Sequence, residues 1–141
     1  MTLSFDHVNW IAVLVAAAVA FLLGGLWYSP LLFAKAWIRL HKITDEQMKE
    51  IQAKGAGKQY ATAFASNFVV ATVLSLLLGV TAADGVPDGL CLAGLCWVGF
   101  VGTTGLVNTI FSFRPLALFA LDGAYQLVYF LVMGAILGAW R

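Results

Sequence analysis

Apolar residues are grouped into four long stretches that short polar segments separate. The stretches cover residues 8–28, 59–80, 89–111 and 116–139, and a helix needs about 20 residues to cross the hydrocarbon core of a bilayer. Residues typical of turns lie between them, such as "SP" at 29–30 and "SFRP" at 112–115. Because a segment in lipid must satisfy its own backbone N–H and C=O groups, each stretch is predicted to be a helix. The pattern therefore predicts one all-α integral membrane domain over residues 1–141, with four transmembrane helices.

The composition supports a membrane protein. Apolar residues make up 62% of the 141 residues and charged residues only 11%, whereas a soluble domain typically has about 25% charged residues. The chain therefore lacks the charged side chains that cover a surface in water. The formal net charge is only +1, which gives no reason to expect a nucleic-acid partner.

The polar connection at residues 31–58 is predicted to contain two short helices. In "LLFAKAWIRLHK" the apolar and basic residues fall on opposite helical faces, which is typical of an amphipathic helix that lies on an anionic membrane surface. Six side chains in and before it are expected at the lipid interface: Lys35, Trp37, Arg39, Lys42, Trp27 and Tyr28. In "TDEQMKEIQAKG", Thr44 and Gln47 form a capping-box pattern and Gly55 is the expected stop. Both helices suit packing on the membrane surface, and a docking surface for a partner is the alternative.

The distribution of charge predicts an orientation. Seven of the eight basic residues lie in the first and third connections, while the second connection has Asp84 and Asp88 and no basic residue. Basic residues concentrate in cytoplasmic loops. The 31–58 connection is therefore expected in the cytoplasm and both termini outside. The first stretch is expected to be a retained anchor, because no Lys or Arg precedes it as in a signal peptide.

The fourth apolar stretch contains a polar face. Asp122, Tyr125, Gln126 and Tyr129 are spaced by three, four and seven residues, so they share one side of a helix. A polar face of this kind is expected to face protein rather than lipid. Three residues in the second and third stretches lie at similar expected depths and can join it to form one polar intramembrane cluster: Asn67, Thr104 and Asn108.

Two interpretations of this cluster stay open. The cluster can serve only to hold the helices together through interhelical hydrogen bonds, which contribute about 0.6–2 kcal/mol each in membranes. An ionised Asp at mid-helix costs about 2.5–3.5 kcal/mol to insert, which that role does not require. We therefore expect a permease-like or channel-like protein in which a proton or small solute contacts Asp122. The alternative is a structural or regulatory membrane subunit that uses its basic face to dock lipid or a partner.

Glycine and alanine residues at helical spacing form more faces for close helix–helix packing than a single four-helix chain requires. They let helices approach closely where no hydrophobic force drives association. From these residues we expect a homo-oligomer. They recur at helical spacing in three stretches: Gly99, Gly102 and Gly105; Gly134 and Gly138; Ala16, Ala20 and Gly24.

The residues of enzymes and metal sites do not occur in the required patterns. We find no Ser-His-Asp set, no carboxylate pair within a stretch and no metal-ligand spacing. His7 and His41 fall at opposite membrane faces, and Cys91 and Cys96 are interpreted as packing residues. We therefore expect neither catalysis nor a cofactor or metal.

The segment "GGLWYSPLLFAKAW" at residues 24–37 resembles a known family. Together with Asn9-Trp10, Ile43-Thr44 and the closing "GAILGAW", it is similar to the small bacterial membrane proteins called domain of unknown function family 1761. The resemblance covers essentially the whole chain, although Ala34 stands where the family-like pattern has Gly. It implies a multi-pass protein of the bacterial inner (plasma) membrane with four spans, and it supplies no reaction.

Overall fold

The helices of the computed structural model, which describes residues 5–140, confirm the all-α membrane fold. Four helical segments are long and apolar enough to cross a membrane. They are α1 (Trp10–Trp27), α4 (Gly57–Val80), the segment α5 (Gly85–Cys96)–η1 (Trp97–Gly102)–α6 (Thr103–Phe111), and α7 (Leu116–Ala139). Two short helices, α2 (Ala34–Leu40) and α3 (Asp45–Lys54), connect α1 to α4. No strand occurs within the described range.

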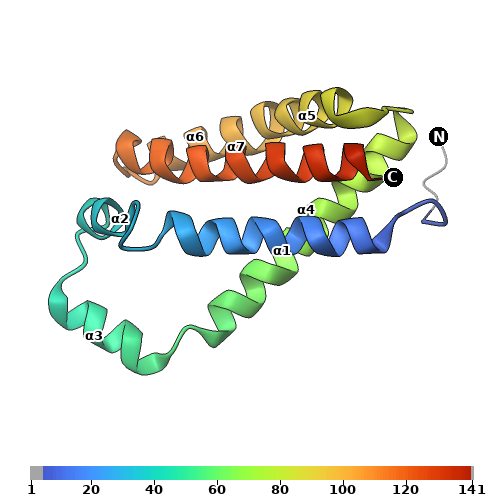
Figure 1. The fold of residues 1–141 in the computed structure, drawn as a ribbon. Coiled ribbons are helices and arrows are strands. Elements are labelled where there is room, and N and C mark those ends of the chain that lie inside the picture. The colour runs from blue at the N-terminus through green and yellow to red at the C-terminus, as the bar shows by residue number, and fades with distance from the viewer. Residues whose placement is uncertain (1–4, 141) are drawn as a thin grey trace.

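The long helices form a bundle with two different ends (Figure 1). The α5–α6 segment, α7 and α1 lie roughly side by side, and α4 crosses them at a steep inclination. One end carries α2 and α3, and we call it the α2–α3 end. The other end, where α1 begins and α7 finishes, also holds the α4–α5 connection, and we call it the terminal end. The first half of α4 leaves the bundle as it approaches α3 (Figure 1), so the helices are closest together toward the terminal end.

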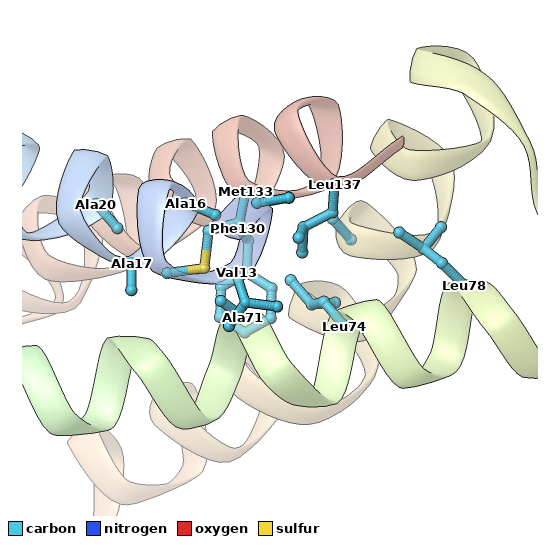
Figure 2. Packing of buried hydrophobic residues seen from close by; sticks show 12 residues of the cluster. Val13, Ala16, Ala17, Ala20, Ala71, Leu74, Leu78, Phe130, Met133 and Leu137 are labelled. Atoms are coloured by element: carbon cyan, nitrogen blue, oxygen red, sulfur yellow. The ribbon is translucent and has the colours of Figure 1, made fainter. Parts of the chain in front are cut away.

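The buried core joins α1, α4 and α7 (Figure 2). Small residues of α1 lie against larger ones of the other two helices, including Leu74 and Met133, which are at most 2% exposed. Large apolar side chains such as Leu22 and Phe100 point outward instead, with about 70% of their surface exposed (69% and 73%). Apolar residues on the outside and small residues at the contacts are the pattern expected when lipid surrounds the helices. The fully buried residues of α1 are Ala12, Val13, Ala16, Ala17 and Ala20.

Glycines make the tightest helix contact, between α5 and α7. A Cβ atom on Gly134 would overlap the backbone oxygen of Gly89, and one on Gly138 would overlap that of Gly85. The predicted small-residue pair Gly134 and Gly138 therefore packs inside the chain. The small residues of α1 also pack against other helices of the same chain, since Ala16 is fully buried. Any homo-oligomer, which stays a prediction, has to use other surfaces.

The third span differs from its prediction in two respects. It begins at Gly85 rather than residue 89, because Pro87 lies in the first helical turn, where a backbone N–H has no helical partner. The Asp88 carboxylate strengthens this start by accepting a hydrogen bond of 2.9 Å from the Asp84 N–H. The span also contains the π-helical turn η1. The sequence does not predict this turn, because apolar residues lie on every side of this helix and no hydrophobic periodicity marks the change from α- to π-helix.

The two connecting helices agree well with the sequence. In α3 the Thr44 hydroxyl accepts from the Gln47 N–H at 3.2 Å, and the Gln47 side chain accepts from the Thr44 N–H at 3.0 Å. The capping box is therefore confirmed. Gly55 ends α3 with φ of +71°, a backbone conformation that favours glycine. The predicted amphipathic helix corresponds to α2. It covers only Ala34–Leu40, so it is shorter than the stretch over which apolar and basic residues alternate in the sequence.

We expect Gly134→Ala to lower the free energy of unfolding in detergent by about 1–3 kcal/mol, as overpacking typically does. The added methyl group would meet the Gly89 backbone, which cannot move without shifting α5. The matched control is Gly94→Ala on the same helix pair, where a Cβ would have an ordinary contact of 3.7 Å with Leu131. The control should unfold at the parent temperature or higher. Equal losses in both variants would contradict this account of the α5–α7 contact.

Candidate functional site

The central feature of the site is a hydrogen bond between Tyr28 and Asp122. The Tyr28 hydroxyl donates to Oδ1 of Asp122 at 2.7 Å and links positions 94 residues apart in the chain. Asp122 lies in the first half of α7, and Tyr28 is the residue that follows α1. Both side chains are half-buried. Burial, and then the bond to Asp122, raise the pKa of the Tyr28 phenol above its ordinary value, so this hydroxyl stays protonated and remains a donor.

The local sequence explains how Tyr28 reaches Asp122. The Tyr28 N–H still donates to the Gly24 oxygen at 3.0 Å, so the residue keeps its place at the end of α1. The Ser29 hydroxyl donates to the Leu26 oxygen at 2.7 Å, and Pro30 follows it. These residues stop the helix and turn the chain toward α2. The Tyr28 ring is thereby held at the mouth of the bundle, where its hydroxyl meets α7.

Tyr125 joins three helices beside this pair. Its hydroxyl donates to the Ala20 oxygen of α1 at 3.2 Å and lies close to the side chain of Asn67 on α4. Asn67 is only 7% exposed. A Cβ atom on Gly24 would come within 2.6 Å of the Tyr125 hydroxyl, so glycine at this position makes room for the phenol. On the polar face of α7, Asp122 and the Tyr125 hydroxyl therefore each have a protein partner from the α1 region.

An aromatic cluster surrounds the two tyrosines. The Tyr28 ring is edge-to-face with Tyr125 at 5.4 Å and with Trp37 at 6.2 Å between centroids. The cluster continues along α7 to Tyr129, whose ring centroid is 5.1 Å from that of Tyr125. Trp27 packs on Tyr125 from α1 at 6.1 Å. The end of α1, the helix α2 and the first half of α7 are thus held together largely by rings.

Asp122 faces a cavity of about 820 Å³ at the α2–α3 end, which we call the large cavity. Side chains from α2, α3, α4 and α7 and from the turn after α1 line it. Its polar and aromatic lining residues include Tyr28, Trp37, Tyr60, Asp122, Tyr125 and Gln126. The cavity exists because α4 diverges from the bundle toward α3, while the rings of Tyr28 and Trp37 stay with α7.

A second cavity of about 390 Å³ lies between α6 and α7, and we call it the small cavity. Asp122 and Gln126 line this cavity as well as the large one. On the opposite wall are Asn108 and Arg114, which are exposed side chains. The Asp122 carboxyl group therefore lies where two hollows of the α2–α3 end meet, rather than in a closed contact between helices.

The structure brings most of the predicted cluster together. Tyr125, Gln126 and Tyr129 share the face of Asp122, Asn67 reaches Tyr125, and Asn108 shares the small cavity with Asp122. Thr104 lies one turn before Asn108 in α6, is exposed, and does not line either cavity.

The residues expected at the lipid interface divide into two groups. The aromatic ones, Trp27, Tyr28 and Trp37, are half-buried and belong to the site. The cations Lys35, Arg39 and Lys42 are exposed. Sequence reasoning missed Tyr28 as the partner of Asp122, since aromatic residues at the end of a span are usually interfacial. The available signal was the Ser29-Pro30 turn, which brings Tyr28 to the same end of the bundle as Asp122.

No metal site is found in the described part of the chain. Within residues 5–140, no group of three or more His, Cys, Asp or Glu side chains is arranged to hold a metal ion. Cys91 and Cys96 are free thiols on α5. The candidate site is therefore defined by one carboxyl group, phenols and amides.

We expect Tyr28→Phe to lower the free energy of unfolding by about 1 kcal/mol, since it removes the donor to Asp122 and keeps the ring. Tyr60→Phe is the matched control, because it removes an exposed hydroxyl group from the wall of the same cavity. Detergent unfolding of both variants, with and without Asp122→Ala, measures the coupling. The Tyr28 effect should shrink once Asp122 is absent. An unchanged effect would mean that this hydrogen bond does not stabilise the fold.

Comparison with known proteins identifies a family and assigns no activity. The family model described as "Protein of unknown function (DUF1761)" matches residues 11–138, which covers all four spans except the first residue of α1 and the last residue of α7. A search of curated proteins and a search of solved structures each found no significant match. On the extent of the family match, the chain belongs to domain of unknown function family 1761, as the residues around Trp27 and Tyr28 had indicated.

Proposed function

We propose that this protein is a permease-like membrane protein that binds a small solute in the large cavity, with Asp122 as the central contact. The observation that carries the proposal is a carboxyl group, held by a single phenol, in the wall of a cavity of about 820 Å³. Sites for small molecules usually have volumes of about 300–1,000 Å³ and combine apolar walls with a few converging polar groups. The large cavity has both properties.

The geometry favours a solute site over interhelical glue. A carboxyl group used as glue should be enclosed by the helices it joins, as Asn67 is at 7% exposure. Asp122 instead lines two cavities and is half-buried. A carboxyl group inside a membrane span is costly, and such groups commonly mark ion or substrate pathways. Asp122 is therefore the group that we expect to exchange a proton or contact a cation.

The cavities favour a permease over an open channel. Both lie at the α2–α3 end, which the basic residues predict to be cytoplasmic. Toward the terminal end, Val13, Leu74 and Met133 fill the centre of the bundle, and α5 is closed on α7 by glycine contacts. A solute that enters the large cavity can leave on the other side only if the helices rearrange. Such alternation about a central site is the usual mechanism of secondary transporters.

The proposal predicts that water reaches Gln126 inside the membrane. In a protein without native cysteines (Cys91→Ala, Cys96→Ala), Gln126→Cys should react with a membrane-impermeant maleimide from one side of the membrane only. Ala124→Cys is the matched control, because it lies at nearly the same depth of α7 and is exposed toward lipid. It should not react from either side. The measurement is labelling in right-side-out and inside-out vesicles.

Two results would overturn the solute site. If Gln126→Cys is as unreactive as Ala124→Cys, lipid or protein fills the cavity. If Gln126→Cys reacts equally from both sides, the protein forms an open pore rather than a permease. Labelling from the side opposite to the predicted one would instead reverse the expected orientation and leave the solute site standing.

The exposed cations of the α2 region favour a second candidate function, a regulatory or structural subunit that docks on anionic lipid. Under that function, replacing Lys35, Arg39 and Lys42 with Gln should strongly weaken association of the purified protein with anionic vesicles, because basic residues near a membrane contribute about 1 kcal/mol each. Lys49 and Lys54 on α3, changed to Gln, are the control for loss of charge. If the solute site is the function, labelling at Gln126→Cys should be the same in both variants.

A further inference from the structure

We propose that the solute of the large cavity is an organic cation, an ammonium or phosphonium group that carries apolar or aromatic substituents. This inference rests on the proposed function and names its substrate class. It is drawn from three properties of the cavity wall: the sign of its charge, the arrangement of its rings and its size.

The charge of the wall selects against anions. Among the described residues, 5–140, Asp122 is the one carboxyl group that lines the large cavity, and no Lys or Arg of that range lines it. His41 also lines the large cavity, where its ring packs against that of Trp37 at 4.2 Å between centroids. Arg114 faces the small cavity, on the other side of Asp122. An anion would therefore meet a carboxylate without a cationic partner, whereas a cation would pair with it.

The rings of the wall suit a cation that is not strongly hydrated. Tyr28 is turned by 74° from Trp37 and by 72° from Tyr125, so neighbouring rings present faces and edges in different directions. Aromatic rings that line a site can bind quaternary ammonium groups through cation–π attraction, and Tyr28, Trp37 and Tyr125 all line the large cavity. Tyr60, 61% exposed at the start of α4, adds a further ring to the wall.

The size and the remaining side chains point to an organic rather than an inorganic ion. Metal cations such as Ca²⁺ take six to eight oxygen ligands in a tight shell, whereas a volume of about 820 Å³ holds a molecule of drug size. Ile38 on α2 and Met48 on α3 add apolar surface to the wall of the large cavity. A methionine side chain adapts to ligands of different shape. The wall therefore offers one site for the charge and apolar surface for the substituents.

The test uses two ions of the same shape and opposite charge, tetraphenylphosphonium and tetraphenylborate. Their binding to the purified parent protein is measured by equilibrium dialysis in a neutral detergent, with empty micelles subtracted. We expect saturable binding of the cation and none of the anion. Phenyltrimethylammonium, a smaller cation, is measured in the same way. It tests the cation class even if tetraphenylphosphonium is too large for the cavity.

Variants locate the binding. Asp122→Asn keeps an oxygen that accepts from Tyr28, so it should fold, and it should weaken cation binding about tenfold or more through loss of the charge pair. Trp37→Leu keeps the apolar bulk and should weaken it about three- to tenfold by removing one π face. Asp84→Asn, an exposed carboxylate at the terminal end, is the matched control and should bind like the parent.

The outcomes separate the substrate class from the proposed function. Saturating tetraphenylphosphonium should slow maleimide labelling of Gln126→Cys, whereas tetraphenylborate should not. If neither cation binds, or if both tetraphenyl ions bind equally and Asp122→Asn has no effect, the cation class is wrong. The solute site then still stands when Gln126→Cys is labelled from one side. If Gln126→Cys is unreactive as well, the proposed function fails together with the substrate class.

Discussion

The architecture depends on close packing between helices that gain nothing from hydrophobic association, because lipid is as apolar as their side chains. Glycines hold α5 against α7 so closely that a single Cβ would overlap the partner backbone. Alanines of α1 play the same part toward α4 and α7. These contacts are concentrated toward the terminal end. The helices are consequently free to diverge at the α2–α3 end, and both cavities beside Asp122 lie there.

The polar groups at the divergent end fall into two environments. The Tyr125 hydroxyl donates to the Ala20 oxygen and lies close to the buried Asn67 where α1, α4 and α7 meet, so these residues connect the packed part of the bundle to the open part. Asp122 has Tyr28 as its hydrogen-bond donor and borders open space on two sides. Asn67 is therefore enclosed by protein, whereas Asp122 and Tyr125 both line the large cavity.

The segment that carries the family resemblance also builds the site. Residues 24–37 supply the glycine that makes room for Tyr125, the donor to Asp122 and three further residues of the large cavity wall, Pro30, Ala34 and Trp37. Ala34, which departs from the family-like pattern, lines that wall and occupies space that a glycine would leave empty. The size of the cavity in this chain therefore depends in part on this one methyl group.

The sequence alone determined the number of membrane helices, the capping box of α3 and the face of α7 that carries Asp122, because each of these depends on hydrogen bonds or spacing within a few residues. Tertiary structure decided what Asp122 meets. Its partner Tyr28 is 94 residues away, and the contact depends on how the chain turns after α1. The cavities depend on the inclination of α4, which small residues set through contacts between distant segments. Local spacing defines a face, and only the crossing of helices determines what that face touches.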